Sequence, residues 1–72
     1  MKQDERLIRF GERLKEIRLS KGLTQLNLAE NIGSSEPTIS RAEKGKHNPT
    51  LLWILRVSNS LGIEPTELID RL

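Results

Sequence analysis

The chain has 72 residues, no cysteine and 31% charged side chains. This length suits one small domain, and the lack of cysteine excludes disulfide bonds and agrees with a reducing cytoplasm. The longest apolar run, Leu51–Leu55, is far too short to span a bilayer, and the charged segment Met1–Arg9 does not resemble a signal peptide. The sequence therefore predicts a cytoplasmic protein without a membrane partner.

The net charge of +2 is small but unevenly distributed. Residues 1–22 carry seven Lys or Arg against four Asp or Glu, and residues 44–56 carry three basic side chains and no acidic one. Residues 23–43 and 57–72 each have a net charge of −2. Positive charge on both sides of a central segment suits contact with phosphates. A solvated surface of mixed sign is the alternative, and charge alone does not choose between them.

The apolar pattern predicts a first helix at about residues 5–20. Gly11 lies inside this helix, where Gly costs about 1 kcal/mol relative to Ala. We interpret it either as tolerated or as a point of close approach. The residues that recur at intervals of three and four, and so share one face, are Leu7, Phe10, Leu14 and Ile17.

Residues 24–43 are typical of two short helices joined by a tight turn. The first is expected at about 25–31 with Thr24 as N-cap; Asn27 stands where a capping box takes Glu or Gln, so we expect a half-made cap. Gly33 follows, where positive φ is needed. The second is expected at about 36–43, with Ser35 as N-cap. This is the layout of a helix-turn-helix, whose second helix can enter a DNA major groove.

Two further helices are expected at about residues 50–61 and 65–71. From the second of them, Leu68 and Ile69 are expected to face inward. No segment has a strand pattern, so the sequence predicts an all-α fold, a compact five-helix bundle that forms a single domain over residues 1–72. The inner stripe of the helix at 50–61 is predicted to be Leu51, Ile54, Leu55, Ser58 and Leu61, with Leu52 and Trp53 off that stripe.

The segment GLTQLNLAENIGSSEPTISRAEKGKHNPT resembles the phage-repressor and Cro family of helix-turn-helix regulators, the xenobiotic-response-element-like domain. Matching residues continue in family order from about Leu7 to about Leu68. Two positions depart locally from the family pattern: Ser34 replaces a usual aliphatic residue, and Ala42 replaces what is often a larger one. The resemblance implies a lambda-repressor-like DNA-binding fold, double-stranded DNA as partner, and a transcriptional regulator whose favoured role is repression.

The resemblance implies that the exposed side of helix 36–43 reaches base edges. Arg41 can donate two hydrogen bonds to guanine, although a phosphate contact is the alternative. Glu36 can accept from cytosine N4 or simply complement the helix dipole, and these two roles are left open. Pro37 and the Thr38 methyl group can touch a thymine methyl group, while Pro37 also fixes the start of the helix.

A second set of residues is predicted to contact phosphates. Gln25 opens its helix, where free N–H groups and the dipole favour an anion, and the matching family glutamine binds a phosphate. Lys44 and Lys46 are the next candidates, and Ser40 is a weaker one. A lone histidine without cysteine makes a metal site improbable, so His47 is expected to be solvated or to contact a phosphate. The full predicted set is Gln25, Ser35, Ser40, Lys44, Lys46, His47 and Asn48.

The resemblance also implies that Arg18 and Glu43 pair beneath the helix-turn-helix. A partly buried pair of this kind costs desolvation but fixes geometry. We therefore predict a structural role for both residues rather than DNA contact.

The C-terminal part of the chain is predicted to mediate homodimerisation, as in family relatives. Core filling is the alternative for Trp53. A two-fold dimer places two reading helices about 34 Å apart on successive major grooves of a near-palindromic operator. The candidate interface residues are Trp53, Ile63, Pro65 and Leu72.

Other classes of function are less well supported by the sequence. The alternative to a DNA-binding regulator is a protein-interaction module, such as the partner-binding antitoxin of a toxin–antitoxin pair. No catalytic residue, cofactor or metal site is predicted, because the chain offers one histidine, no cysteine and no glycine-rich phosphate loop. The length leaves no room for a small-molecule effector domain.

Overall fold

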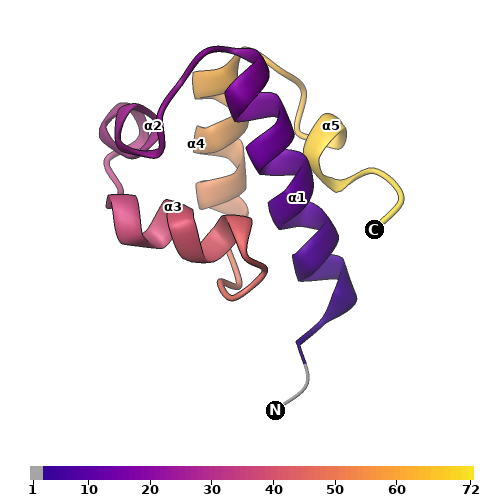
Figure 1. Cartoon of the computed structure of the whole chain (residues 1–72). Helices are drawn as coiled ribbons and strands as arrows, with labels where there is room; N and C mark the ends of the chain where they lie inside the picture. The colour runs from indigo at the N-terminus through magenta and orange to yellow at the C-terminus, as the bar shows by residue number, and fades with distance from the viewer. Residues whose placement is uncertain (1–2) are drawn as a thin grey trace.

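The computed structural model describes residues 3–72, which form five α-helices and no strand (Figure 1). The described chain measures 31 × 24 × 22 Å, and the predicted all-α five-helix bundle is confirmed. The predicted domain span of 1–72 includes residues 1 and 2, which lie outside the described residues. The helices are α1 (Glu5–Ser20), α2 (Gln25–Ile32), α3 (Glu36–Glu43), α4 (Leu51–Leu61) and α5 (Thr66–Ile69).

Three helices have boundaries that differ slightly from the sequence predictions. Helix α2 extends one residue further, and α4 begins at Leu51 because Thr50 is its N-cap rather than its first residue. Helix α5 is shorter than predicted at both ends. It stops at Ile69 because Asp70 has extended backbone, with ψ 136°, and Arg71 adopts a left-handed conformation with φ 62°.

The N-terminus of α2 has a complete capping box. The Thr24 hydroxyl accepts from the Asn27 backbone N–H at 3.0 Å, and the Asn27 side-chain oxygen accepts from the Thr24 N–H at 3.2 Å. The prediction of a half-made cap was therefore wrong. The amide oxygen of Asn takes the role that a capping box usually gives to Glu or Gln.

The core lies between α1 and the helix-turn-helix, with α4 and α5 closing its other sides. Helix α1 packs against α3 and α5, and α2 packs against α3 and α4. In Figure 1, α2 and α3 lie on one side of α1 and α5 on the other. Gly11 is a point of close approach: a Cβ atom there would collide with the Ala42 carbonyl oxygen and lie 2.8 Å from the Glu43 carbonyl carbon. The buried apolar residues are Phe10, Leu14, Ile17, Leu28, Ala29, Ile32, Ile39, Ala42, Val57, Leu61 and Leu68.

The predicted inner stripe of α4 is correct in its second half and wrong at its start. Ser58 and Leu61 are buried and Ile54 packs against the core, while Leu52, predicted off the stripe, is 64% exposed. Leu51 and Leu55, which we assigned to the inner stripe, are 70% and 42% exposed. Val57, which the prediction omitted, is fully buried. Ile69 of α5, also predicted to face inward, is 40% exposed. The cause on α4 is the run of apolar residues at its start, which surrounds the helix and gives no preferred face.

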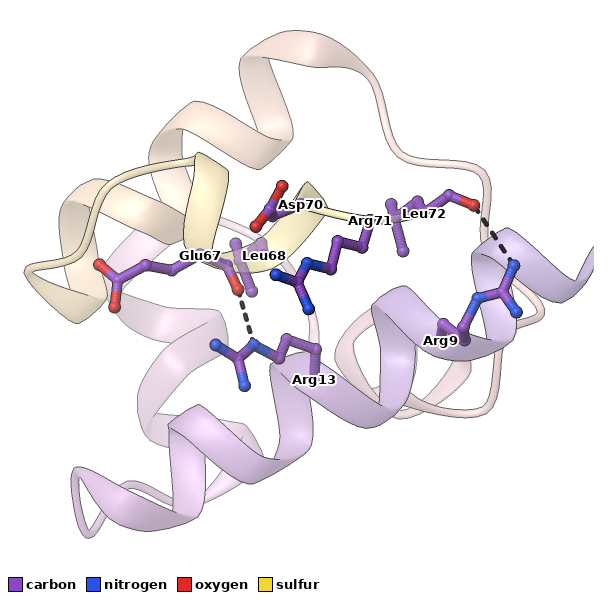
Figure 2. Close-up of a pocket in the computed structure, with 7 residues that line it drawn as sticks. All are labelled: Arg9, Arg13, Glu67, Leu68, Asp70, Arg71 and Leu72. Carbon is purple, nitrogen blue, oxygen red and sulfur yellow. Dashed lines mark hydrogen bonds between the residues drawn. The ribbon is translucent and has the colours of Figure 1, made fainter.

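Arginines from α1 hold the C-terminal segment in place. The Arg13 Nε atom donates to the Glu67 carbonyl oxygen at 2.7 Å, and an Arg9 guanidinium N–H donates to the Leu72 carbonyl oxygen at 3.3 Å (Figure 2). These arginines, with Arg71, line an open hollow of about 460 Å³ between α1 and the C-terminal segment. A four-residue helix has few internal hydrogen bonds, and the Arg13 donor satisfies one carbonyl group that α5 leaves free, while Arg9 holds the residue at the end of the chain.

Candidate nucleic-acid interface

Helix α3 has a buried face and an outward face. Ile39 and Ala42 are fully buried against the core. Glu36, Pro37 and Arg41 are exposed on the other side, and Thr38 and Ser40 are half-buried between the two faces. The structure therefore brings three predicted base-contacting residues, Glu36, Pro37 and Arg41, to the solvent-facing side of one short helix, with the fourth, Thr38, at its edge.

A tight turn sets the position of α3 relative to α2. Gly33 ends α2 in a left-handed conformation with φ 69°, which explains the glycine. The Ser34 N–H then donates to the Ala29 carbonyl oxygen at 2.9 Å. The Ser35 hydroxyl caps α3 by accepting from the Thr38 N–H at 3.3 Å, and Pro37 lies in the first turn. The hydroxyl groups of Ser35 and Thr38 are also 2.8 Å apart, so the Ser35 hydroxyl already has two hydrogen-bonding partners within the chain.

A buried ion pair lies beneath the helix-turn-helix. The Arg18 Nε atom donates to Glu43 Oε2 at 2.6 Å, and Arg18 Nη2 donates to Glu43 Oε1 at 3.0 Å. Only 7% of the Arg18 side chain and 3% of the Glu43 side chain are exposed. The third guanidinium nitrogen donates to the Leu23 carbonyl oxygen at 2.7 Å. Both charges are thus paired and hydrogen-bonded in a bidentate geometry, which is what a buried pair requires.

Gln25 is the link between this ion pair and the predicted phosphate site. It is the first residue of α2 and is half-buried. Its Nε2 atom donates to Glu43 Oε1 at 3.0 Å. A glutamine amide has two N–H groups, so one remains for a phosphate while the other is held by Glu43. The backbone N–H groups at the start of α2 lie beside it, at the positive end of the helix dipole.

The loop after α3 carries the remaining predicted phosphate contacts. Lys44, Lys46 and Asn48 are exposed. Gly45, between the two lysines, has φ 74°, and a Cβ atom there would lie 2.8 Å from the Ile8 Cα atom, so this loop lies directly on α1. The Gln3 side chain donates to the carbonyl oxygens of Lys44 and Gly45 at 3.2 and 3.1 Å.

His47 is half-buried rather than solvated. Its ring lies 5.1 Å from that of Trp53, with the planes tilted by 58°. Burial, and secondarily the charge of Arg41, lower the pKa of His47 below its ordinary value of 6.5. At neutral pH the side chain is therefore an uncharged ring beside the outward face of α3.

The outward face of α3 is bordered by cations without a carboxylate partner. Over residues 3–72, the ion pairs are formed by other side chains, so Arg41, Lys44 and Lys46 have no paired acid. No group of three His, Cys, Asp or Glu in this range is arranged to hold a metal ion. None of the described helices combines the length and the hydrophobicity needed to cross a membrane.

A family model described as Helix-turn-helix, HTH_3, matches residues 14–68. The chain belongs to this helix-turn-helix family. It is 40% identical to the restriction-modification controller protein C.AhdI from Aeromonas hydrophila, with a TM-score of 0.88 over 90% of this chain and 98% of that chain. It is 37% identical over 62 residues to the control protein C.BamHI of Bacillus amyloliquefaciens, covering 85% of this chain and 76% of that protein.

A third relative comes from a prophage. The chain is 41% identical over 54 residues to the SPbeta prophage-derived uncharacterized HTH-type transcriptional regulator YonR of Bacillus subtilis. The match covers 75% of this chain and spans half of that protein's length. The predicted resemblance to phage-repressor and Cro-type regulators is confirmed, and the helix-turn-helix protein described here is a DNA-binding transcriptional regulator.

Sequence reasoning missed two features of this interface. It did not predict the hydrogen bond from Gln25 to Glu43. It also did not predict that Trp53 contacts Ser34 and His47. The signal for the second feature was the position of Trp53 in the first turn of its helix, close to the loop that contains His47.

Replacing Arg18 should destabilise the fold strongly. Arg18→Ala leaves the Glu43 carboxylate buried with Gln25 as its one side-chain partner, a change expected to cost roughly 3–5 kcal/mol. Urea denaturation measures this loss.

The control is Lys15→Ala, an exposed site in the same helix where the change should stay within about 0.5 kcal/mol. Replacing both partners, with Arg18→Met and Glu43→Leu, should recover most of the stability. Equal stability of Arg18→Ala and the parent protein would show that the pair has no structural role.

The stability of the protein should depend on pH through His47. Because the pKa of His47 is lowered in the folded state, the unfolded chain binds a proton more readily below pH 6.5. The free energy of unfolding should therefore be highest above that pH and decrease as pH falls through and below it. His47→Gln has no such titration. In urea denaturation, its free energy of unfolding relative to that of the parent protein should therefore rise as pH is lowered from 7.5 to 5. Parallel pH profiles of the two proteins would contradict the assignment, because His47 is the single histidine.

Proposed function

We propose that this helix-turn-helix protein is a sequence-specific repressor that binds a near-palindromic operator as a homodimer. The observation that supports this proposal is the division of α3 into a fully buried face and an outward face. Ile39 and Ala42 pack against the core, while Glu36, Pro37 and Arg41 remain exposed. An α-helix presented in this way fits the B-DNA major groove, which is about 12 Å wide.

In this proposal the residues of α3 read the sequence. Arg41 donates two hydrogen bonds to the O6 and N7 atoms of a guanine, a contact worth about 1–3 kcal/mol of discrimination. Pro37 and the Thr38 methyl group contact a thymine methyl group. Glu36 either accepts from cytosine N4 or serves the dipole of α3, since a carboxylate near phosphates is repelled.

The phosphates on either side of the groove are bound by the flanking segments. Gln25 and the N-terminal N–H groups of α2 bind one phosphate, and Lys44 and Lys46 bind others. These side chains differ in how accessible they are to a phosphate. Lys44 and Lys46 are exposed, whereas His47 is half-buried beside Trp53. Ser35, Ser40, His47 and Asn48 complete the proposed phosphate-contacting set.

A dimer needs an apolar surface outside the fold's own core, and α4 offers one. Leu51 and Leu55 lie one turn apart, and Leu52 lies beside them. They are 70%, 42% and 64% exposed, and they form a strip on one side of α4 that we name the α4 leucine ridge. Apolar strips of this kind mark protein contacts, and we propose that a second copy of this chain covers it. The candidates predicted from the sequence, Trp53, Ile63, Pro65 and Leu72, are half-buried, and Trp53, Ile63 and Leu72 pack against the protein's own core.

Base reading and phosphate binding predict different effects of two substitutions. Arg41→Ala should reduce the preference for the operator over a variant with one changed base pair by about 10-fold or more. Lys46→Ala should weaken binding to all sequences alike and reduce the slope of log K against log salt by about 1. Fluorescence anisotropy at several salt concentrations, on an operator selected from genomic fragments, measures both effects.

Two outcomes of this titration would contradict the proposal. Equal effects of both substitutions on every sequence would show that Arg41 binds a phosphate instead of a base. Absence of any binding beyond the weak, salt-sensitive background would favour the alternative function, a partner-binding antitoxin-like module. The proposal includes no catalytic role, and it places the protein in the cytoplasm with DNA.

Charge introduced on the α4 leucine ridge should dissociate the dimer. Leu52→Glu places a carboxylate in the proposed apolar contact, so analytical ultracentrifugation should detect a monomer and anisotropy should detect weaker operator binding. Leu19→Glu is the matched control, because Leu19 is 57% exposed at the far end of α1 and should leave the dimer unchanged. A Leu52→Glu protein that remains dimeric would show that the α4 leucine ridge is not the dimer interface. A parent protein that binds operator DNA as a monomer would contradict the proposed homodimer.

A further inference from the structure

The indole of Trp53 lies between the two segments that flank α3. Trp53 is in the first turn of α4, where its backbone N–H donates to the Thr50 hydroxyl at 3.1 Å. Its Nε1–H donates a long hydrogen bond of 3.5 Å to the hydroxyl of Ser34, in the turn before α3. Its ring lies 5.1 Å from that of His47, in the loop after α3. One side chain of α4 therefore contacts the chain on both sides of the reading helix.

We propose that Trp53 is a positioning residue for the reading of DNA by α3. The indole holds the turn that leads into α3 and the loop that leads out of it, and so fixes the angle at which α3 enters the groove. The inference rests on the proposed function, because it extends base reading by α3 to a residue that acts through its neighbours.

Helix α3 needs such support because it is short. It has eight residues, and a helix of that length is not stable in water without tertiary contacts. It packs against α1 and α2 through its buried face. A helix fastened along one face can still tilt about that contact, and side chains that read bases must be held to within about 0.5 Å. Contacts at the two ends of α3 oppose this tilt.

Trp53 is suited to this role because its own position is fixed by the core. The side chain is half-buried and packs against the central apolar cluster. An indole has two side-chain torsions, so little freedom remains once its inner edge is packed. Core filling explains the packing of the ring. Its contacts with Ser34 and His47 lie outside the core cluster, in the two segments that flank α3.

If Trp53 positions α3, replacing it should change the specificity for DNA, whereas replacing an ordinary core residue should change stability alone. Three substitutions and one control test this difference. Trp53→Leu removes both contacts, Trp53→Phe removes the Nε1–H donor and keeps a ring against His47, and Ser34→Ala removes the acceptor. Val57→Ala is the control: Val57 is fully buried in the same helix and contributes to the core without being one of the flanking contacts. Anisotropy measures each variant on the operator, on an operator with one changed base pair, and on unrelated DNA, at a temperature where all variants are folded.

We expect Trp53→Leu to lower the ratio of operator to changed-operator affinity by about 10-fold, while binding to unrelated DNA stays the same. Trp53→Phe and Ser34→Ala should each lower the ratio less, and the double variant should equal either one alone, because both remove the same hydrogen bond. Val57→Ala should lower the melting temperature and leave the ratio unchanged. An unchanged ratio in Trp53→Leu would overturn the proposal and make Trp53 a core residue only.

A second measurement does not depend on DNA. In Trp53→Leu, amide hydrogen exchange should accelerate more at Ser34 and Lys44–Lys46, whose N–H groups are hydrogen-bonded in the parent protein, than in the middle of α1, whereas Val57→Ala should lower protection across the whole domain. If the parent protein shows no operator preference, the proposed function fails, and this exchange pattern still decides whether Trp53 positions α3. Uniform loss of protection in Trp53→Leu would overturn the positioning role.

Discussion

The buried ion pair between Arg18 and Glu43 is the interaction on which the DNA-binding surface depends. It joins the end of α1 to the end of α3, and the same guanidinium holds the Leu23 carbonyl oxygen just before α2. The same carboxylate holds the side chain of Gln25, the first residue of α2. The start of α2 and the end of α3 are the two places where the helix-turn-helix meets phosphates in the proposed complex. One pair therefore fixes both ends of the surface, which is a structural reason to bury two charges despite their desolvation cost.

Helix α1 forms the platform beneath this surface, and two glycines let it come close. At Gly11 a side chain would collide with the last turn of α3, and at Gly45 it would collide with the backbone of Ile8 in α1. The backbones of α1 and of the segment 42–45 therefore lie in direct contact. Close packing of this kind permits few alternative arrangements. The lysines on either side of Gly45 extend from a loop whose path is set by α1, so their charges are presented at a defined place.

Much of this architecture could be predicted from the sequence, because caps and glycines leave local signals. Thr24, Gly33 and Ser35 mark the ends of α2 and the start of α3, and each has the predicted backbone role. The inner face of α4 could be predicted at its end, where Ser58 and Leu61 are buried, but not at its start. Leu51 to Leu55 are all apolar, so a period of 3.6 residues fits several faces, and only tertiary packing selects Trp53 and Ile54 over Leu51 and Leu55. The hydrogen bonds from Gln25 to Glu43 and from Trp53 to Ser34 could not be predicted either, because they join residues 18 and 19 positions apart.

The proposed reading surface consists of residues that make few contacts within the fold. Arg41, Lys44 and Lys46 have no carboxylate partner within residues 3–72, and the positive charge of Arg41 contributes to lowering the pKa of His47. Like charges gathered on one face repel one another, and this repulsion is a cost that the folded protein carries before DNA is bound. Phosphates supply the opposite charge and remove the repulsion, while the counterions they release add to affinity. The fixed geometry that the buried ion pair and the glycine contacts give to the region beneath α3 thus holds the outward face in place while its charges remain unneutralised.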